Sequence, residues 1–127
     1  MNQNSLGSVI NVLPTDQRAS SSVSSAVDVS AYEGNAIIVL DSALADAGTN
    51  PTLDAKITHC DTSDGTYTDI SGAAFAQVTD AADSTQKIIV NLDSVKKYIK
   101  ADYTIGGTDT PKFSFSVNLF ALKKYNG

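Results

Sequence analysis

Apolar residues occupy every second position over residues 112–122, KFSFSVNLFAL. The alternating positions are Phe113, Phe115, Val117, Leu119 and Ala121. Successive side chains of an extended strand point to opposite sides, so this spacing predicts a strand with one face in a core. Residues 52–59 (TLDAKITH) and 98–105 (YIKADYTI) alternate in the same way. This period predicts a protein built from β-strands.

Further strand signals recur about every ten residues, which is the spacing of a sandwich or barrel. They lie at residues 23–29, 36–40, 67–70, 73–78 and 86–92, with turn residues between them. The apolar runs 36–40 (AIIVL) and 86–92 (QKIIVNL) predict strands buried on both faces. The short connections leave no room for the helical crossovers of a parallel sheet. We therefore predict an all-β fold, an antiparallel β-sandwich of seven to eight short strands, jelly-roll-like.

The first 22 residues differ from the rest because they are polar and rich in Ser. They hold one apolar island, Val9, Ile10, Val12 and Leu13, which ends at Pro14. This composition favours flexibility. We expect an extended N-terminal arm over residues 1–22 and a sandwich domain over residues 23–127. The alternative is that the island forms a first strand at a sheet edge.

Charge and hydropathy exclude several classes of partner. The formal net charge of −5 argues against nucleic acid. No stretch approaches the roughly 18 apolar residues of a membrane-spanning helix, and the N-terminus lacks the pattern of a signal peptide. We expect no membrane association and synthesis in a reducing cytoplasm. The single cysteine, Cys60, cannot form an internal disulfide.

No group of residues has the pattern of a catalytic or metal site. His59 and Cys60 are adjacent, so a strand through both would point them to opposite faces. The chain has no second His, and we expect Cys60 to be a small buried residue. The turn DTSDG at residues 61–65 lacks the spacing of a calcium loop. We expect no enzyme activity, no metal and no cofactor.

The remaining candidates are protein-contact residues. Lys96 and Lys97 lie next to Tyr98, and Tyr125 follows a second Lys pair. Tyrosine combines apolar area with a polar tip and suits interfaces. The lysines either contact an acidic neighbouring subunit or guard exposed strand edges against aggregation. Together with the apolar island, the expected interface comprises Val9, Ile10, Val12, Leu13, Lys96, Lys97, Tyr98 and Tyr125.

Three segments resemble the capsid cement (decoration) proteins of tailed bacteriophages. They are KITHCDTSDGTYTDI (56–70), AAFAQV leading to IIVNL (73–92), and KKYIKADYTIGG followed by FSFSVNLFALKK (96–124). The resemblance implies a jelly-roll-like sandwich on the exterior of the virion that fastens neighbouring major capsid subunits. We also expect association with itself, as a dimer or trimer. Residues 1–22 lie outside the resemblance.

Two other functions are open. One is a receptor-binding or sugar-binding module of a phage tail or fibre, which the absence of Trp disfavours. The other is a small hydrolase, which we rank last because the sequence offers no coherent nucleophile–base pair or metal set.

Overall fold

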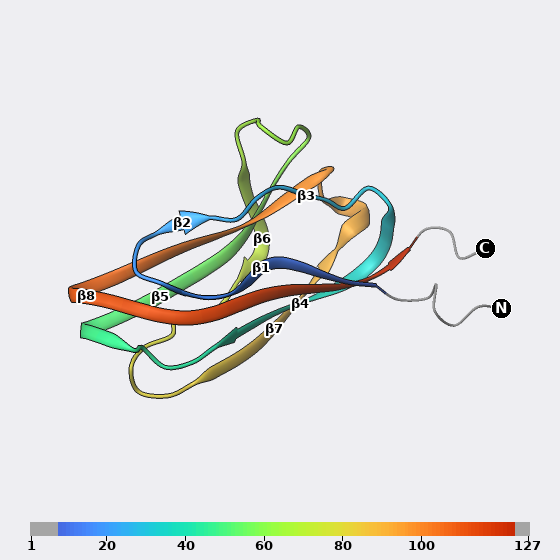
Figure 1. Ribbon diagram of the computed structural model, residues 1–127. Helices are drawn as coiled ribbons and strands as arrows, with labels where there is room; N and C mark the ends of the chain where they lie inside the picture. The colour runs from blue at the N-terminus through green and yellow to red at the C-terminus, as the bar shows by residue number, and fades with distance from the viewer. Residues whose placement is uncertain (1–7, 124–127) are drawn as a thin grey trace.

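The computed structural model describes residues 8–123, whose regular structure is almost entirely β-strand (Figure 1). The elements are β1 (Ser8–Arg18), β2 (Ser22–Val23), β3 (Val27–Asp28), β4 (Tyr32–Ser42), β5 (Ala47–Cys60), β6 (Thr68–Ala74), β7 (Ser84–Asn91), the 3-10 turn η2 (Leu92–Ser94) and β8 (Tyr98–Lys123). Every strand pairing is antiparallel. The all-β antiparallel class predicted from the sequence is confirmed.

The strands form two sheets that share β8. The second half of β8 lies between β1 and β4, and β7 pairs with the other edge of β4. We call this layer the β4 sheet. The first half of β8 lies between β5 and the short strands β2 and β3, and β6 pairs with the other edge of β5. This layer is the β5 sheet.

A bend in β8 joins the two sheets. The sequence predicted two separate strands, over residues 98–105 and 112–122, whereas a single strand of 26 residues runs through both segments and through Gly106-Gly107 between them. Gly107 has a φ of 115°, and a Cβ at this position would lie 2.9 Å from the carbonyl oxygen of Asn50. Only glycine fits there. In Figure 1 the orange and red halves of β8 meet at this bend, at the left of the view.

The strand order is that of a jelly roll. The first half of the chain runs antiparallel to the second, which gives the pairs β1 with β8, β2 and β3 with β8, β4 with β7, and β5 with β6. Rolling this long hairpin brings β4 and β5 against β8 as well. The resulting strand order is β1-β8-β4-β7 in one sheet and (β2, β3)-β8-β5-β6 in the other. The jelly-roll prediction is therefore confirmed.

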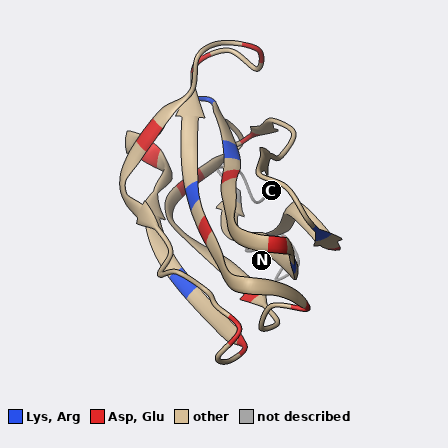
Figure 2. Ribbon diagram, turned by 90° about the vertical axis from the view of Figure 1, so that its left-hand side faces the viewer, with Lys and Arg blue, Asp and Glu red and all other residues tan. Residues whose placement is uncertain are grey.

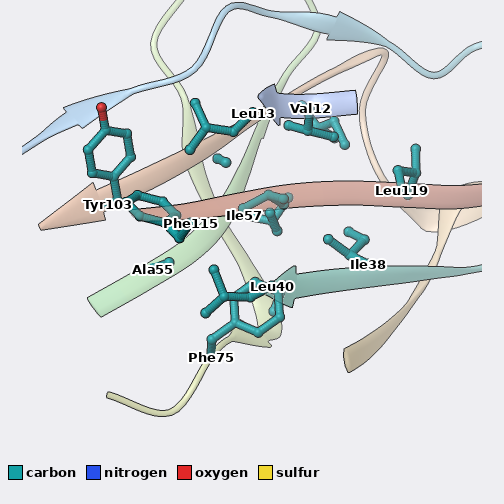
Figure 3. Close-up of a cluster of buried hydrophobic side chains, with 14 of the residues drawn as sticks. Val12, Leu13, Ile38, Leu40, Ala55, Ile57, Phe75, Tyr103, Phe115 and Leu119 are labelled. Atoms are coloured by element: carbon teal, nitrogen blue, oxygen red, sulfur yellow. The ribbon is translucent and has the colours of Figure 1, made fainter. Parts of the chain in front are cut away.

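The core lies between the two sheets and is filled by the inward residues of each strand (Figure 3). The alternating residues of β8 predicted to face inward are all buried. Tyr103 and Phe115, from the two halves of β8, meet edge to face with ring centroids 5.1 Å apart. Ile38 and Leu40 of β4 and Ile57 of β5 fill the centre of the core.

The expectation of a separate arm is wrong for residues 8–18, because they form β1. This strand pairs with β8 from Ser8 opposite Ala121 to Arg18 opposite Phe113. Val12 and Leu13 both point into the core, where they are buried (Figure 3). A bulge after Asn11 places these two adjacent residues on the core side, because it interrupts the alternation. The alternative of an edge strand describes this segment correctly.

A side-chain amide closes one gap between the two sheets. Gln86 of β7 donates from Nε2 to the carbonyl of Ala76 at 2.9 Å and accepts from the Ala76 amide through Oε1 at 2.7 Å. Ala76 follows β6, so these two hydrogen bonds connect the β6 edge of one sheet to the β7 edge of the other, as a pair of backbone hydrogen bonds would. The sandwich is thereby nearly closed into a barrel.

Arg18, the only arginine in the chain, covers the opposite gap, where the chain passes from β1 to β2. Its guanidinium donates to the carbonyls of Asp16 (3.1 Å), Phe115 (2.9 Å) and Pro14 (2.6 Å). It also lies over the ring of Phe115, 4.9 Å from the centroid, and 5.8 Å from that of Tyr103. Arg18 therefore links both halves of β8 to β1.

We expect Arg18→Ala to lower the free energy of unfolding by about 2–4 kcal/mol, because three charge-assisted hydrogen bonds and a cation–π contact are lost. Urea denaturation at pH 7 measures the loss. Arg18→Lys is the matched control, because lysine keeps the charge but lacks the planar fork. It should recover less than half of the loss. A cost under about 0.5 kcal/mol for Arg18→Ala, the range of ordinary surface changes, would contradict this role.

Candidate protein-binding surfaces

An apolar row crosses the outer face of the β4 sheet. The strand register places Val9 of β1 opposite Phe120 of β8, Phe120 opposite Ile37 of β4, and Ile37 opposite Ile89 of β7. These four residues therefore form one continuous line across all four strands. We call it the apolar row. Its side chains are exposed, by 64% for Val9, 43% for Phe120, 39% for Ile37 and 62% for Ile89. Leu122, exposed by 51%, extends the row along β8.

The rest of this face has few charges. Around the apolar row the outward positions that solvent reaches are mainly neutral and polar: Asn11, Asn35, Thr85, Asn91, Ser114 and Asn118. The charged residues among the outward positions of β4 and β7 are Glu33, Asp41 and Lys87. Depletion of charge around exposed apolar and aromatic side chains is typical of the centre of a protein interface.

The face also corrects an expectation from the sequence. Residues 36–40 and 86–92 were predicted to be buried on both sides, yet only one side of each strand faces the core. Ala36, Ile38 and Leu40 are buried, whereas Ile37 is exposed. In β7, Val90 is buried and Ile89 is exposed. The apolar pattern of these strands therefore exceeds what the core of one chain uses.

The outer face of the β5 sheet is different, because charged side chains alternate along its strands. Asp54 and Lys56 lie on β5, and Lys100 and Asp102 lie on β8. Lys56 forms an ion pair with Asp69 of β6 at 2.9 Å, between exposed side chains. Figure 2 shows further acidic residues in the β5–β6 loop at the top of the view. A face of this composition is readily solvated.

One end of the β5 sheet carries a patch of lysine and tyrosine. Lys97 Nζ lies 5.3 Å from the ring centroid of Tyr98, and Lys100 Nζ lies 4.5 Å from that of Tyr67. Tyr67 donates its hydroxyl to the carbonyl of Ser63 at 2.8 Å, and burial raises the pKa of Tyr67. We call these four residues the Lys–Tyr patch. Its rings are held in place and half-buried, which suits a contact surface.

The structure places the interface residues predicted from the sequence in several different environments. Val9 is exposed and belongs to the apolar row, whereas Ile10 is half-buried against the core. Val12 and Leu13 are buried and so are not available to a partner in this fold.

On the other side of the molecule, Lys97 and Tyr98 lie in the Lys–Tyr patch, and Lys96 is exposed beside it. Tyr125 lies outside the described residues. The sequence reading missed Phe120, Ile37 and Ile89. The available signal was that Phe120 breaks the polar series Ser114, Ser116, Asn118 on the outward side of its strand.

His59 and Cys60 lie at the end of β5. His59 Nδ1 accepts a hydrogen bond from the Lys96 amide at 3.2 Å, so this nitrogen holds the segment between η2 and β8. Burial lowers the pKa of His59, and the charge of Lys96 lowers it further. Cys60 is half-buried rather than buried, and a hydrogen bond with the Thr62 backbone lowers its pKa.

Beside His59 a hollow of about 310 Å³ opens between β6, β7 and η2, and Asp69 and Asn91 also line it. Residues 8–123 contain no cluster of three or more His, Cys, Asp or Glu side chains that could hold a metal ion. In the same range, no helix has the length and hydropathy to cross a membrane.

No family model and no curated protein sequence matches the chain. Among solved structures, that of infectious bursal disease virus, Gt strain, matches with a TM-score of 0.62 and 14% identity, over 94% of this chain and 34% of that chain. The VP2 subviral particle of the same virus matches with a TM-score of 0.60 and 16% identity, over 92% and 32%.

The chain thus spans about a third of the length of these viral proteins. A xylan-binding domain of Paenibacillus barcinonensis Xyn10C matches with a TM-score of 0.48 and 12% identity, over 94% of this chain and 88% of that domain. At these identities the likeness concerns the fold alone.

Proposed function

We propose that the protein is a structural component of a virus particle, a cement subunit that binds the outside of a phage head and fastens neighbouring major capsid subunits. Its place would be the exterior of the virion, after synthesis in the host cytoplasm. The observation that carries the proposal is the presence of two surfaces of interface composition, the apolar row and the Lys–Tyr patch, on opposite sheets. A subunit that bridges others needs at least two contact surfaces.

The fold and its neighbours support this function. Viral capsid proteins are among the known users of the jelly roll, and the solved structures with the highest TM-scores above come from a viral particle. A cement subunit works through surface complementarity, and repetition over a symmetric shell multiplies modest affinities into firm retention. We assign the shell contact to the Lys–Tyr patch, whose cations suit an acidic capsid surface.

The proposal predicts that the purified protein raises the melting temperature of expanded, empty shells. Lys100→Glu should weaken shell binding by about tenfold, because it reverses a charge in the patch and removes the cation from the ring of Tyr67. Lys112→Glu is the matched control, since it changes the net charge equally at the β8 bend. Calorimetry and co-sedimentation of shells measure both effects. Unchanged shell stability at saturating protein would refute the proposal.

A sugar-binding or receptor-binding module of a tail or fibre is the second candidate. It is favoured by the two tyrosines of the Lys–Tyr patch, which lie close enough for Tyr98 to affect the pKa of Tyr67. Aromatic rings are common contacts in sugar-binding sites, although this chain has no Trp. Binding to a glycan array that is lost in Tyr98→Ala would favour this candidate over the cement function.

A further inference from the structure

We infer that two copies of this chain pair face to face through the outer surfaces of their β4 sheets, around a two-fold axis along the apolar row. The inference concerns the free protein and does not depend on the proposed virion role. It begins with the row itself, in which Val9, Phe120, Ile37 and Ile89 lie in register across four strands. Single exposed apolar residues are ordinary, but a continuous line of them marks a contact surface.

The size of the face suits a stable dimer. β7 has 8 residues, and at about 3.4 Å per residue such a strand is roughly 27 Å long. Four strands spaced by about 4.8 Å cover roughly 19 Å. The plan area is then on the order of 500 Å², and the accessible area of the projecting side chains is larger. A standard interface buries about 800 Å² per partner, so the whole face is of the required size.

The charges of the face favour a second copy as the occupant. A two-fold axis along the row sets each row residue against the same residue of the partner, so apolar meets apolar. Residues on one side of the row then face those on the other side. Lys87 lies on one side, level with Val39, and Glu33 lies on the other, beyond Ile37 along β4. Glu33 is level with Leu122, two positions from the row, and Lys87 is two positions from the row on the other side, so the axis brings Lys87 of one protomer to the level of Glu33 of its partner. Asp41, the other acidic residue of this face, lies two positions further out than Lys87, level with Ser116.

The pairing also accounts for the composition of β4 and β7. Their apolar runs have the pattern of strands buried on both sides, while one chain covers only one side. Stacked sheets of a sandwich pack at about 10 Å with their side chains interdigitated, and a second β4 sheet supplies such a layer. The outer face of the β5 sheet carries alternating charges and has no such apolar pattern.

Sedimentation equilibrium of the full chain tests the inference without any shell. The wild-type protein should be a dimer at micromolar concentration. Ile89→Lys should raise the dissociation constant at least about 100-fold, because it sets two lysines against each other at the axis. Thr104→Lys, an equally new lysine on the outer face of the β5 sheet, is the control and should leave the dimer intact. Ile89 is exposed, so circular dichroism should show both variants folded.

The charge pair supplies a second test. Lys87→Glu should weaken the dimer about tenfold, and the double variant Lys87→Glu with Glu33→Lys should restore it. A wild-type monomer at all concentrations would overturn the inference. Equal loss in Ile89→Lys and Thr104→Lys would overturn it too, as would a dimer that Ile89→Lys leaves unchanged. If instead the wild-type protein is monomeric and Ile89→Lys no longer binds shells, the occupant of the face is the shell and not a second copy.

Discussion

A chain that begins at Ala19 is expected not to fold, and to be recovered as insoluble or disordered protein. The deletion removes β1, and with it Val12 and Leu13 from the core. Burial of two such side chains contributes about 3–6 kcal/mol, and the pairing along β8 adds to this. That sum is comparable with the entire stability of a domain, about 5–15 kcal/mol. The deletion also exposes the edge of β8, a template for aggregation.

A chain that begins at Ser8 is the matched control for this deletion. It retains all of β1, so we expect it to be soluble and to unfold cooperatively. Circular dichroism, thermal melting and one-dimensional proton NMR distinguish the two truncated chains. A folded, cooperative chain from Ala19 would contradict the structure. It would restore the idea of a detachable arm over residues 1–22.

The strand content of this fold follows from local sequence, whereas the place of its first strand does not. The alternation in residues 112–122 predicts which side chains of β8 are buried, and the structure agrees. No comparable local signal decides what Val12 and Leu13 do, because their partner lies about a hundred residues later in the chain. An apolar island bounded by polar residues fits an arm and an edge strand equally well. Pairing over such a separation is a tertiary property.

The candidate surfaces show a similar division. Lys97 and Tyr98 are neighbours in sequence, so this half of the Lys–Tyr patch could be predicted, whereas Tyr67 and Lys100 come together only in the fold. The apolar row could not be predicted, because it depends on the relative register of four strands, and register is set by tertiary pairing. A continuous apolar run such as residues 36–40 predicts burial on both sides but does not say whether the same chain or another covers the second side. Here the structure leaves Ile37 exposed.

Phe115 and Phe120 compare the two faces of the second half of β8, one in the core and the other on the outer surface. Both lie on the second half of β8, but Phe115 is buried in the core and Phe120 projects from the outer face. Phe115→Ala should lower the free energy of unfolding by about 3–5 kcal/mol, because it leaves a cavity beside Tyr103 and removes the ring beneath Arg18. For a domain of this size the melting temperature should fall by roughly 10–25 °C.

Phe120→Ala is the matched control, with the same substitution on the same strand and the opposite face. In the Ile89→Lys background, where the inferred dimer is dissociated, it should cost less than about 1 kcal/mol, because the side chain it removes is exposed. In the wild-type background it should also weaken self-association. Urea denaturation in both backgrounds measures the two effects separately, since stability that depends on pairing varies with protein concentration. Equal losses for Phe115→Ala and Phe120→Ala in the dissociated background would mean that the outer face is already covered within a single chain.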